Sequence, residues 1–171
     1  MELTIAIGQI RPKKGDYPAN LAKLGVLFAQ LDTLDPRPQV LVLPETALSG
    51  YFLEGGVRDV ARTAGELFAD LQAAYTQACG AEAPPLDVAL GFYERFRDRF
   101  YNSALYATLG QNQELRTENL TSDNVVLGSA VLGSSASGIR HVHRKVFLPT
   151  YAVFDEARFV VDEVRELVRD G

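Results

Sequence analysis

The chain has 171 residues, of which 47% are hydrophobic and 23% are charged, and its formal net charge is −5. These values predict one domain large enough to bury a core, and the scattered Lys and Arg residues exclude a polybasic nucleic-acid-binding protein. No apolar run is long enough to span a bilayer, and residues 1–10 show no signal-peptide pattern. The single Cys excludes an internal disulfide and a Cys-rich zinc site, which favours a reducing, cytoplasmic compartment.

The first part of the chain predicts a strand, a helix and a second strand. Residues 3–10 alternate as a strand does, and residues 16–34 carry an apolar stripe of helical period that begins at Asp16. The Pro-rich segment 35–38 ends this helix. The apolar run 40–43 then predicts a strand that is buried on both faces. This order favours a parallel crossover.

The rest of the chain is also predicted to alternate between helices and strands. The predicted elements are a helix over 57–79, strands over 86–93 and 100–109 joined as a hairpin by the charged turn 94–99, a long polar excursion over 110–138 with a strand-like segment at 125–132, a strand over 142–148 and a terminal helix within 155–171. No internal repeat or linker divides the sequence, so residues 1–171 are interpreted as a single α/β domain.

Glu45 is the first candidate for chemistry, because it directly follows the buried strand 40–43 and Pro44. Pro44 has no N–H to donate and therefore ends the strand pairing. A carboxylate is thus delivered to the end of a central strand, which is where open α/β sheets bind their ligands. The structural alternative is that Glu45 caps the short turn before Gly50.

Lys145 is the second charged residue close to a strand end. Strand alternation puts His143, Lys145 and Phe147 on one face, so the ammonium is expected to be partly buried and to need an anion nearby. Glu45 is a candidate for this partner. The alternative is a surface lysine on an edge strand.

Other polar residues admit both a functional and a structural interpretation. Glu156 is either a site carboxylate or an acidic residue that stabilises a helix N-terminus. His141 and His143 alternate on one strand and would need a further ligand to bind a metal ion. The pair Tyr101–Asn102 either lines a pocket or stabilises the hairpin.

Several segments, taken together and in order, resemble the nitrilase, or carbon–nitrogen hydrolase, superfamily. They are AIGQIRPKKGDYPANLAKL (6–24), VLVLPETALSGY (40–51), GFYERF (91–96), YNSALY (101–106) and HRKVFLPTYAVFDEARF (143–159). The last of them is similar to the glutaminase domain of glutamine-dependent NAD synthetases and to stand-alone amidases. The resemblance covers roughly residues 1–159.

The resemblance implies a four-layer α–β–β–α sandwich and a Glu–Lys–Cys triad that hydrolyses a small-molecule amide or nitrile through a thioester, without a cofactor. Glu45 matches the general base, and Lys145 matches the lysine that stabilises the oxyanion. Glu156, with Tyr51 and Tyr151, matches residues that position the substrate. Homo-oligomers are common in this family, and neither a nucleic acid nor a membrane is implied as a partner.

The sequence departs from the family pattern at the nucleophile. The family has its cysteine after the lysine, at the end of a further strand, and no Cys follows Lys145 here. Cys79 lies at the end of a predicted helix and matches none of the family's motif, so we interpret it as a small buried residue. The expectation is a hydrolase domain that is incomplete at its C-terminus and inactive as this chain alone. The alternative is a catalytically inactive binding or assembly protein with the same fold.

Overall fold

The computed structural model describes residues 2–51, 53, 56–110 and 138–145. Its elements, in chain order, are β1 (Ile5–Ile7), α1 (Tyr17–Asp32), β2 (Val40–Val42), α2 (Val57–Val60), α3 (Ala64–Cys79), β3 (Leu86–Phe96), β4 (Arg99–Leu109) and β5 (Gly138–Arg144). The predicted strand-like segment at 125–132 and the predicted terminal helix lie outside the described residues.

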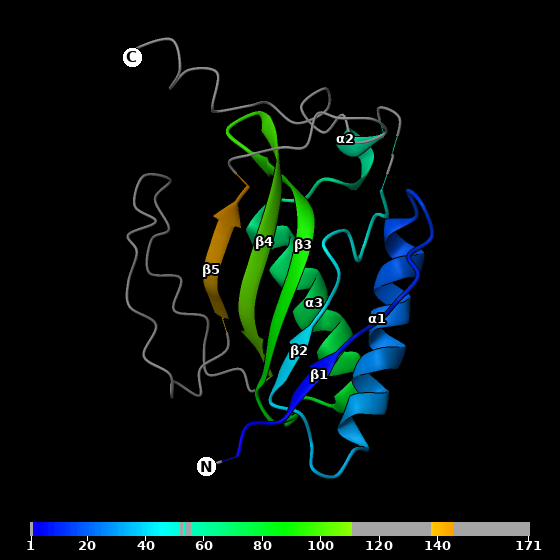
Figure 1. The fold of residues 1–171 in the computed structure, drawn as a ribbon, viewed down its shortest axis with the longest axis vertical. Helices are drawn as coiled ribbons and strands as arrows, with labels where there is room; N and C mark the ends of the chain where they lie inside the picture. Colours follow the sequence, from blue (N-terminus) through cyan, green and yellow to red (C-terminus); the bar gives the residue numbers. More distant parts are fainter. Residues whose placement is uncertain (1, 52, 54–55, 111–137, 146–171) are drawn as a thin grey trace.

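The strands form one sheet in the order β1-β2-β3-β4-β5 (Figure 1). β2 runs parallel to both β1 and β3, whereas β4 pairs antiparallel with both β3 and β5. The strand–helix–strand pattern at the start of the chain is therefore the predicted parallel crossover, and β3 with β4 is the predicted hairpin.

The turn of this hairpin is shorter than the predicted turn 94–99. Strand pairing extends further on both sides, so that only Arg97 and Asp98 lie between β3 and β4. Both have positive φ angles, 47° and 62°, as in the two-residue turns that match the twist of a hairpin. The prediction that Glu94 is a turn residue is wrong, because pairing continues past it and buries it within β3.

Helix α1 begins where the sequence predicts. The Asp16 carboxylate accepts a hydrogen bond of 3.1 Å from the Ala19 N–H, and Pro18 lies in the first turn. The apolar stripe turns inward, with Leu24 and Phe28 fully buried. No helix among the described residues is long and apolar enough to cross a lipid bilayer.

The prediction of one helix over 57–79 is wrong, because α2 and α3 are separate. Ala61 is extended, and Arg62 forms a parallel bridge to Glu94 of β3. Thr63 and Glu66 then close a capping box: the Glu66 N–H donates to the Thr63 hydroxyl at 3.1 Å, and the Thr63 N–H donates to the Glu66 carboxylate at 2.7 Å. This new N-terminus interrupts a stripe that has helical period on both sides of it.

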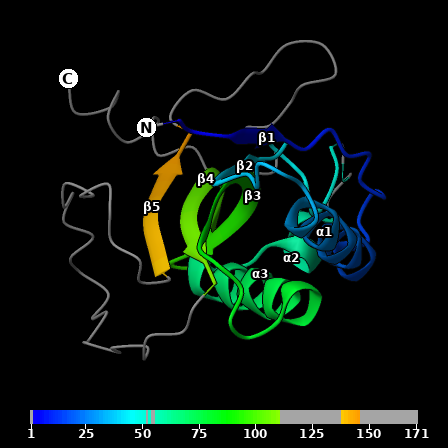
Figure 2. The same cartoon turned by 90° about the horizontal axis from the view of Figure 1, so that it is seen from below.

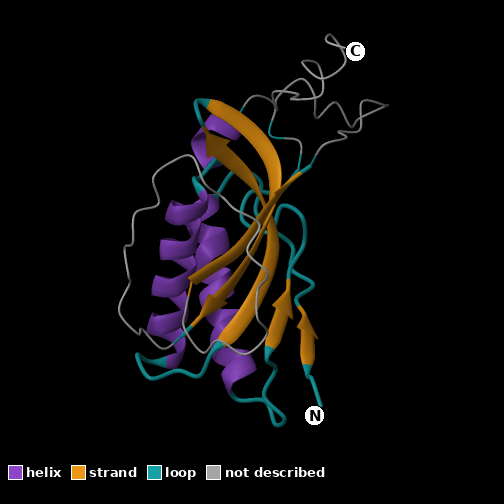
Figure 3. Cartoon of the chain, turned by 90° about the vertical axis from the view of Figure 1, so that its left-hand side faces the viewer, coloured by secondary structure: helices purple, strands orange, loops and turns teal. Residues whose placement is uncertain are grey.

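The helices and the sheet form two layers, with α1 and α3 on the same face of the sheet (Figures 2 and 3). Leu24 of α1 and Leu67 of α3 are fully buried in the core between the layers. Ile5, Ile7 and Val42 point to the opposite face of the sheet and are exposed. The prediction that the strand 40–43 is buried on both faces is therefore wrong, because the described residues place helices over one face only. The described residues thus supply one helical layer and one sheet of the expected sandwich.

Candidate active site

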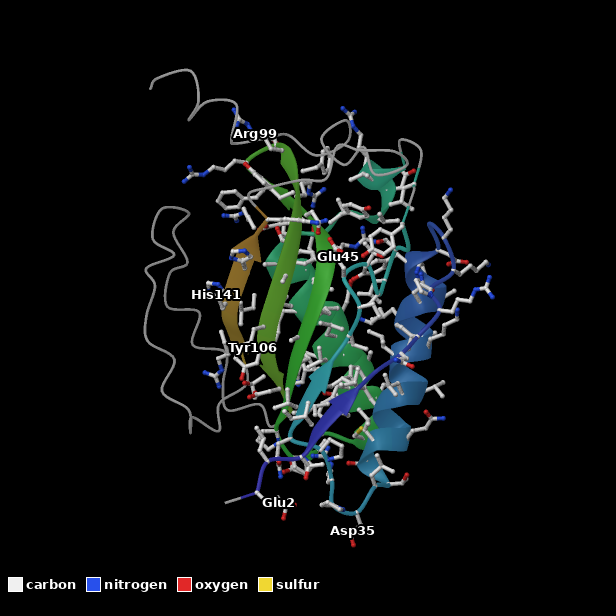
Figure 4. All side chains as sticks on the ribbon, in the orientation of Figure 1. Glu2, Asp35, Glu45, Arg99, Tyr106 and His141 are labelled. Carbon is white, nitrogen blue, oxygen red and sulfur yellow. The ribbon has the colours of Figure 1, made fainter. Side chains whose placement is uncertain are left out.

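Glu45 lies just past the C-terminal end of β2, a strand that has neighbours on both sides in the sheet. The Leu43 N–H still donates to the carbonyl of Ala89 in β3 at 2.8 Å, but Pro44 has no N–H and the pairing stops there. The chain then turns through residues 45–49. Figure 4 shows Glu45 toward the upper end of the sheet, away from Glu2 and Asp35 at the lower end.

Gly91 of β3 allows the backbone of Glu45 to lie directly against the sheet. A Cβ atom at Gly91 would lie 2.0 Å from the Glu45 carbonyl oxygen and 2.5 Å from the Glu45 Cα atom. These distances are too short for any side chain, so the position requires glycine. The Gly91 N–H also donates to the Pro44 carbonyl at 3.3 Å. Sequence reasoning missed this role, for which a glycine inside the predicted strand 86–93 was the available signal.

The turn after Glu45 is held from behind by Asn20 of α1, which is fully buried. Its side-chain amide donates to the carbonyls of Leu48 and Lys13, at 3.0 and 2.8 Å, and its side-chain oxygen accepts from the Lys13 N–H at 2.6 Å. Because a buried amide that loses such partners is left unpaired, this arrangement fixes the turn to α1.

Within the part of the chain that the structure describes, three side chains donate to the Glu45 carboxylate. Its Oε1 atom accepts from Asn102 Nδ2 at 2.7 Å and from Lys145 Nζ at 3.0 Å. Its Oε2 atom accepts from the Tyr51 hydroxyl at 2.5 Å. These donors come from β4, from the residue after β5 and from the loop after β2, so the carboxylate points across the sheet and does not cap its own turn.

The hydrogen bonds determine the charge of Glu45. Burial opposes the ionised form, but the hydrogen bonds from Tyr51, Lys145 and Asn102 outweigh it and lower the pKa of Glu45 below its ordinary value. The Glu45 and Lys145 side chains are 37% and 34% exposed. The Glu45 carboxylate is therefore ionised at neutral pH, and the pair is still reachable from solvent.

Lys145 reaches this carboxylate because strand pairing continues one residue past β5. The Lys145 N–H donates to the Asn102 carbonyl at 2.8 Å, so Asn102 binds Glu45 through its side chain and Lys145 through its backbone. The predicted alternation of β5 is also present, with His143 exposed and Arg144 turned toward buried Glu94. The partner expected for Lys145 is the one observed.

No protein-family model and no curated protein sequence matches the chain. Solved structures do match it. A carbon–nitrogen hydrolase from Helicobacter pylori G27 aligns with 94% of this chain at a TM-score of 0.62 and 16% identity, and Saccharomyces cerevisiae Nit3, of the nitrilase superfamily, aligns with 94% at 0.57 and 15%. A glutamine-dependent NAD+ synthetase from Acinetobacter baumannii aligns with 92% at 0.56 and 24% identity.

The fold is that of the carbon–nitrogen hydrolases. This confirms the predicted α/β, nitrilase-like fold class. The chain spans 44%, 48% and 23% of the lengths of these three proteins, in the order given above. The Glu45–Lys145 pair thus lies within part of a carbon–nitrogen hydrolase fold.

Cys79 is not part of this pair's surroundings. Cys79 is the last residue of α3. The opposite end of α3 begins just after Arg62, whose backbone pairs with β3 near the site. Cys79 is half-buried, whereas the sequence predicts a buried residue. Burial and the nearby Asp32 raise the pKa of its thiol, which Arg37 only partly offsets. Such a thiol is mostly protonated at neutral pH.

The remaining candidate residues divide into two groups. The rings of His141 and His143 stack with centroids 6.3 Å apart, and the described residues hold no group of three or more His, Cys, Asp or Glu side chains that fits a metal ion. Tyr151 and Glu156 lie outside the described residues, so their roles stay predictions. Tyr51 is the one substrate-positioning candidate that the structure brings to Glu45.

Proposed function

We propose that this chain forms part of a carbon–nitrogen hydrolase domain that cleaves a small-molecule amide, with Glu45 as general base and Lys145 as the stabiliser of the oxyanion. The observation that carries the proposal is the hydrogen bond from the Lys145 ammonium to the Glu45 carboxylate. The two residues are 100 positions apart in the sequence, and the fold brings their side chains into contact. An ionised carboxylate beside a fixed cation, within this fold, is suited to proton transfer and to stabilising developing negative charge.

The proposed reaction uses a cysteine thiol. Glu45 takes the thiol proton, and the thiolate attacks the carbonyl carbon of the amide. The carbonyl oxygen becomes an oxyanion next to Lys145. Collapse of this intermediate expels ammonia, which leaves with the proton held by Glu45, and water then hydrolyses the thioester to the acid. Cys79 does not fit this role, so we propose that the nucleophile is not among these 171 residues.

Glutamine is the first substrate to test, since a glutamine-dependent NAD+ synthetase is among the structures with this fold. Tyr51, which donates to Glu45, is proposed to orient the base. Glu156 and Tyr151 are proposed to position the substrate, as the resemblance implies. We also propose that the protein is a homo-oligomer and that it works in a reducing cytoplasm, which would keep a nucleophilic thiol reduced.

A second proposal is a catalytically inactive binding or assembly protein. It is favoured by one observation: Ile5, Ile7 and Val42 are exposed on the sheet face opposite to α1 and α3. A row of exposed apolar side chains on a sheet is typical of a surface that contacts another protein layer.

The two proposals differ in one assay. The intact mass of the native protein defines the chain to use, and ammonia release from glutamine and simple amides is then measured on that protein. Ammonia release that disappears in Glu45→Gln and in Lys145→Met, but persists in Cys79→Ala, supports the hydrolase. Absence of ammonia release from every amide and nitrile supplied favours the binding protein. Loss of activity in Cys79→Ala would contradict the proposal that Cys79 is not the nucleophile.

A further inference from the structure

A second charged pair lies on the other face of the strands that carry the candidate site. Alternation along β3, β4 and β5 turns Asn102 and Lys145 to one face and Glu94, Ser103 and Arg144 to the helix-covered face. Arg144 is the last residue of β5 and directly precedes Lys145. The two pairs are therefore joined through one peptide unit.

The contacts of the Glu94 carboxylate are specific. Arg144 donates to it with both Nε and Nη2, each at 2.8 Å, and the Ser103 hydroxyl donates at 2.7 Å. The guanidinium carbon of Arg144 also lies 3.9 Å from the ring centroid of Phe96. Two-point hydrogen bonding combined with stacking is a geometry that a lysine cannot reproduce.

Burial makes this pair rigid. The Glu94 side chain is 2% exposed and that of Arg144 is 29% exposed. A carboxylate so deeply buried depends on its charged partner, because little solvent reaches it to compensate the charge when the guanidinium moves away. The Arg144 side chain consequently has little conformational freedom. Because Arg144 is the last residue of β5, the end of that strand has little freedom as well.

We propose that Glu94 and Arg144 are positioning residues that fix the end of β5 and thereby keep the Lys145 ammonium on the Glu45 carboxylate. The expected effect on rate rests on the proposed hydrolase function. The effect on the Glu45–Lys145 contact does not, and it is measured separately.

The first test is Glu94→Gln, which keeps the shape of the side chain and removes the charge that holds Arg144. We expect kcat for ammonia release to fall about 10- to 100-fold with KM changed less than about threefold, because the substrate still binds while the cation is displaced. The matched control is Glu66→Gln. It neutralises an exposed ion pair with Arg95, the neighbour of Glu94, and a glutamine retains the capping box. The control should leave kcat unchanged.

The second test does not need catalysis. The Glu45 carboxyl is titrated by NMR in the unaltered protein, in Glu94→Gln and in Glu66→Gln, with Glu45→Gln to assign the signal. Among the described residues, the titratable groups that contact Glu45 are Lys145 and Tyr51, and of these two Lys145 directly follows β5. We expect the pKa of Glu45 to rise toward its ordinary value in Glu94→Gln and to stay low in Glu66→Gln.

The outcomes separate the two proposals. An unchanged Glu45 titration in folded Glu94→Gln overturns the positioning role, whether or not the protein is an enzyme. A shifted titration in a protein that releases no ammonia supports the positioning role and counts against the hydrolase. If Glu94→Gln does not fold, Arg144→Lys takes its place under the same two measurements. It keeps the charge but loses the two-point contact, and it must shift the Glu45 titration for the proposal to stand.

Discussion

Arg144 and Lys145 are neighbours in the sequence, and each forms an ion pair with a glutamate, but the two pairs lie in different surroundings. The Arg144–Glu94 pair is 29% and 2% exposed, and a hydroxyl and aromatic rings surround it. The Lys145–Glu45 pair is 34% and 37% exposed. Both have short hydrogen bonds, so contact distance alone does not distinguish a structural pair from one that is proposed to be reactive.

The difference lies in what each carboxylate can still do. The Glu94 side chain is 2% exposed and is occupied by hydrogen bonds from Arg144 and Ser103, so it offers little access to a further molecule. Among the described residues Glu45 is held by three donors, but its side chain remains accessible to solvent. A general base needs this second environment, in which the carboxylate is oriented and still accessible.

The largest expected effect separates Arg144→Met from Lys145→Met. Loss of the guanidinium leaves a buried carboxylate without its counter-ion, and we expect the free energy of unfolding to fall by about 3–5 kcal/mol. Loss of the half-exposed ammonium should lower it by less than about 1 kcal/mol. Urea unfolding of both variants measures the difference, and equal losses would contradict the distinction between the two pairs.

Gly91→Ala should displace the backbone of Glu45 from its place against β3. The added methyl group meets the Glu45 backbone rather than a flexible side chain, so we expect a loss of about 1–3 kcal/mol in stability and, under the proposed function, about a 100-fold loss of ammonia release. Gly25→Ala in α1 is the control. It meets no heavy atom within 4 Å, and it should stabilise the helix by about 0.5–1 kcal/mol. A neutral Gly91→Ala would show that Glu45 has room to move.

The sequence predicts the site wherever local chemistry decides the structure. The apolar run of β2 and the missing N–H of Pro44 put Glu45 at a strand end, and alternation along β5 put Lys145 on a face where it needs an anion. These inferences need only the period of a strand and the donors of the backbone. They are sufficient to propose the Glu45–Lys145 contact.

The parts that the sequence did not predict depend on strand register and on competing local signals. The charged segment around Glu94 predicts a turn, and only the longer pairing of β3 with β4 buries this residue. The role of Gly91 depends on which backbone crosses it, which no local pattern contains. The break between α2 and α3 had a signal, the capping box of Thr63 and Glu66, but the apolar period around it outweighed that signal.

A smaller effect is expected at Asn102, which joins the two halves of the site. Asn102→Asp sets a second negative charge against Glu45, so the pKa of Glu45 should rise because like charges disfavour ionisation. Asn102→Ala only removes a donor and should raise it less. NMR titration of the three proteins gives the order, and an unchanged pKa in Asn102→Asp would mean that Asn102 does not contact the carboxylate in solution.

The smallest effect is the contribution of Glu45 itself to stability. Its pKa is lower in the folded chain than in the unfolded one, so its contribution is present above the unfolded value of about 4.3 and is lost as the pH falls through the folded value. Because the carboxylate is 37% exposed, we expect this pH-dependent part to stay below about 1 kcal/mol.

Urea unfolding of the unaltered protein and of Glu45→Gln between pH 3 and pH 7 measures this contribution. The gap in unfolding free energy between the two should shrink on acidification, and high salt should reduce the share that comes from the Lys145 charge. A gap that is constant across this range would mean that the three donors position Glu45 without stabilising its ionised form. The pKa of Glu45 would then be close to its ordinary value. The three donors would orient the carboxylate without changing its ionisation.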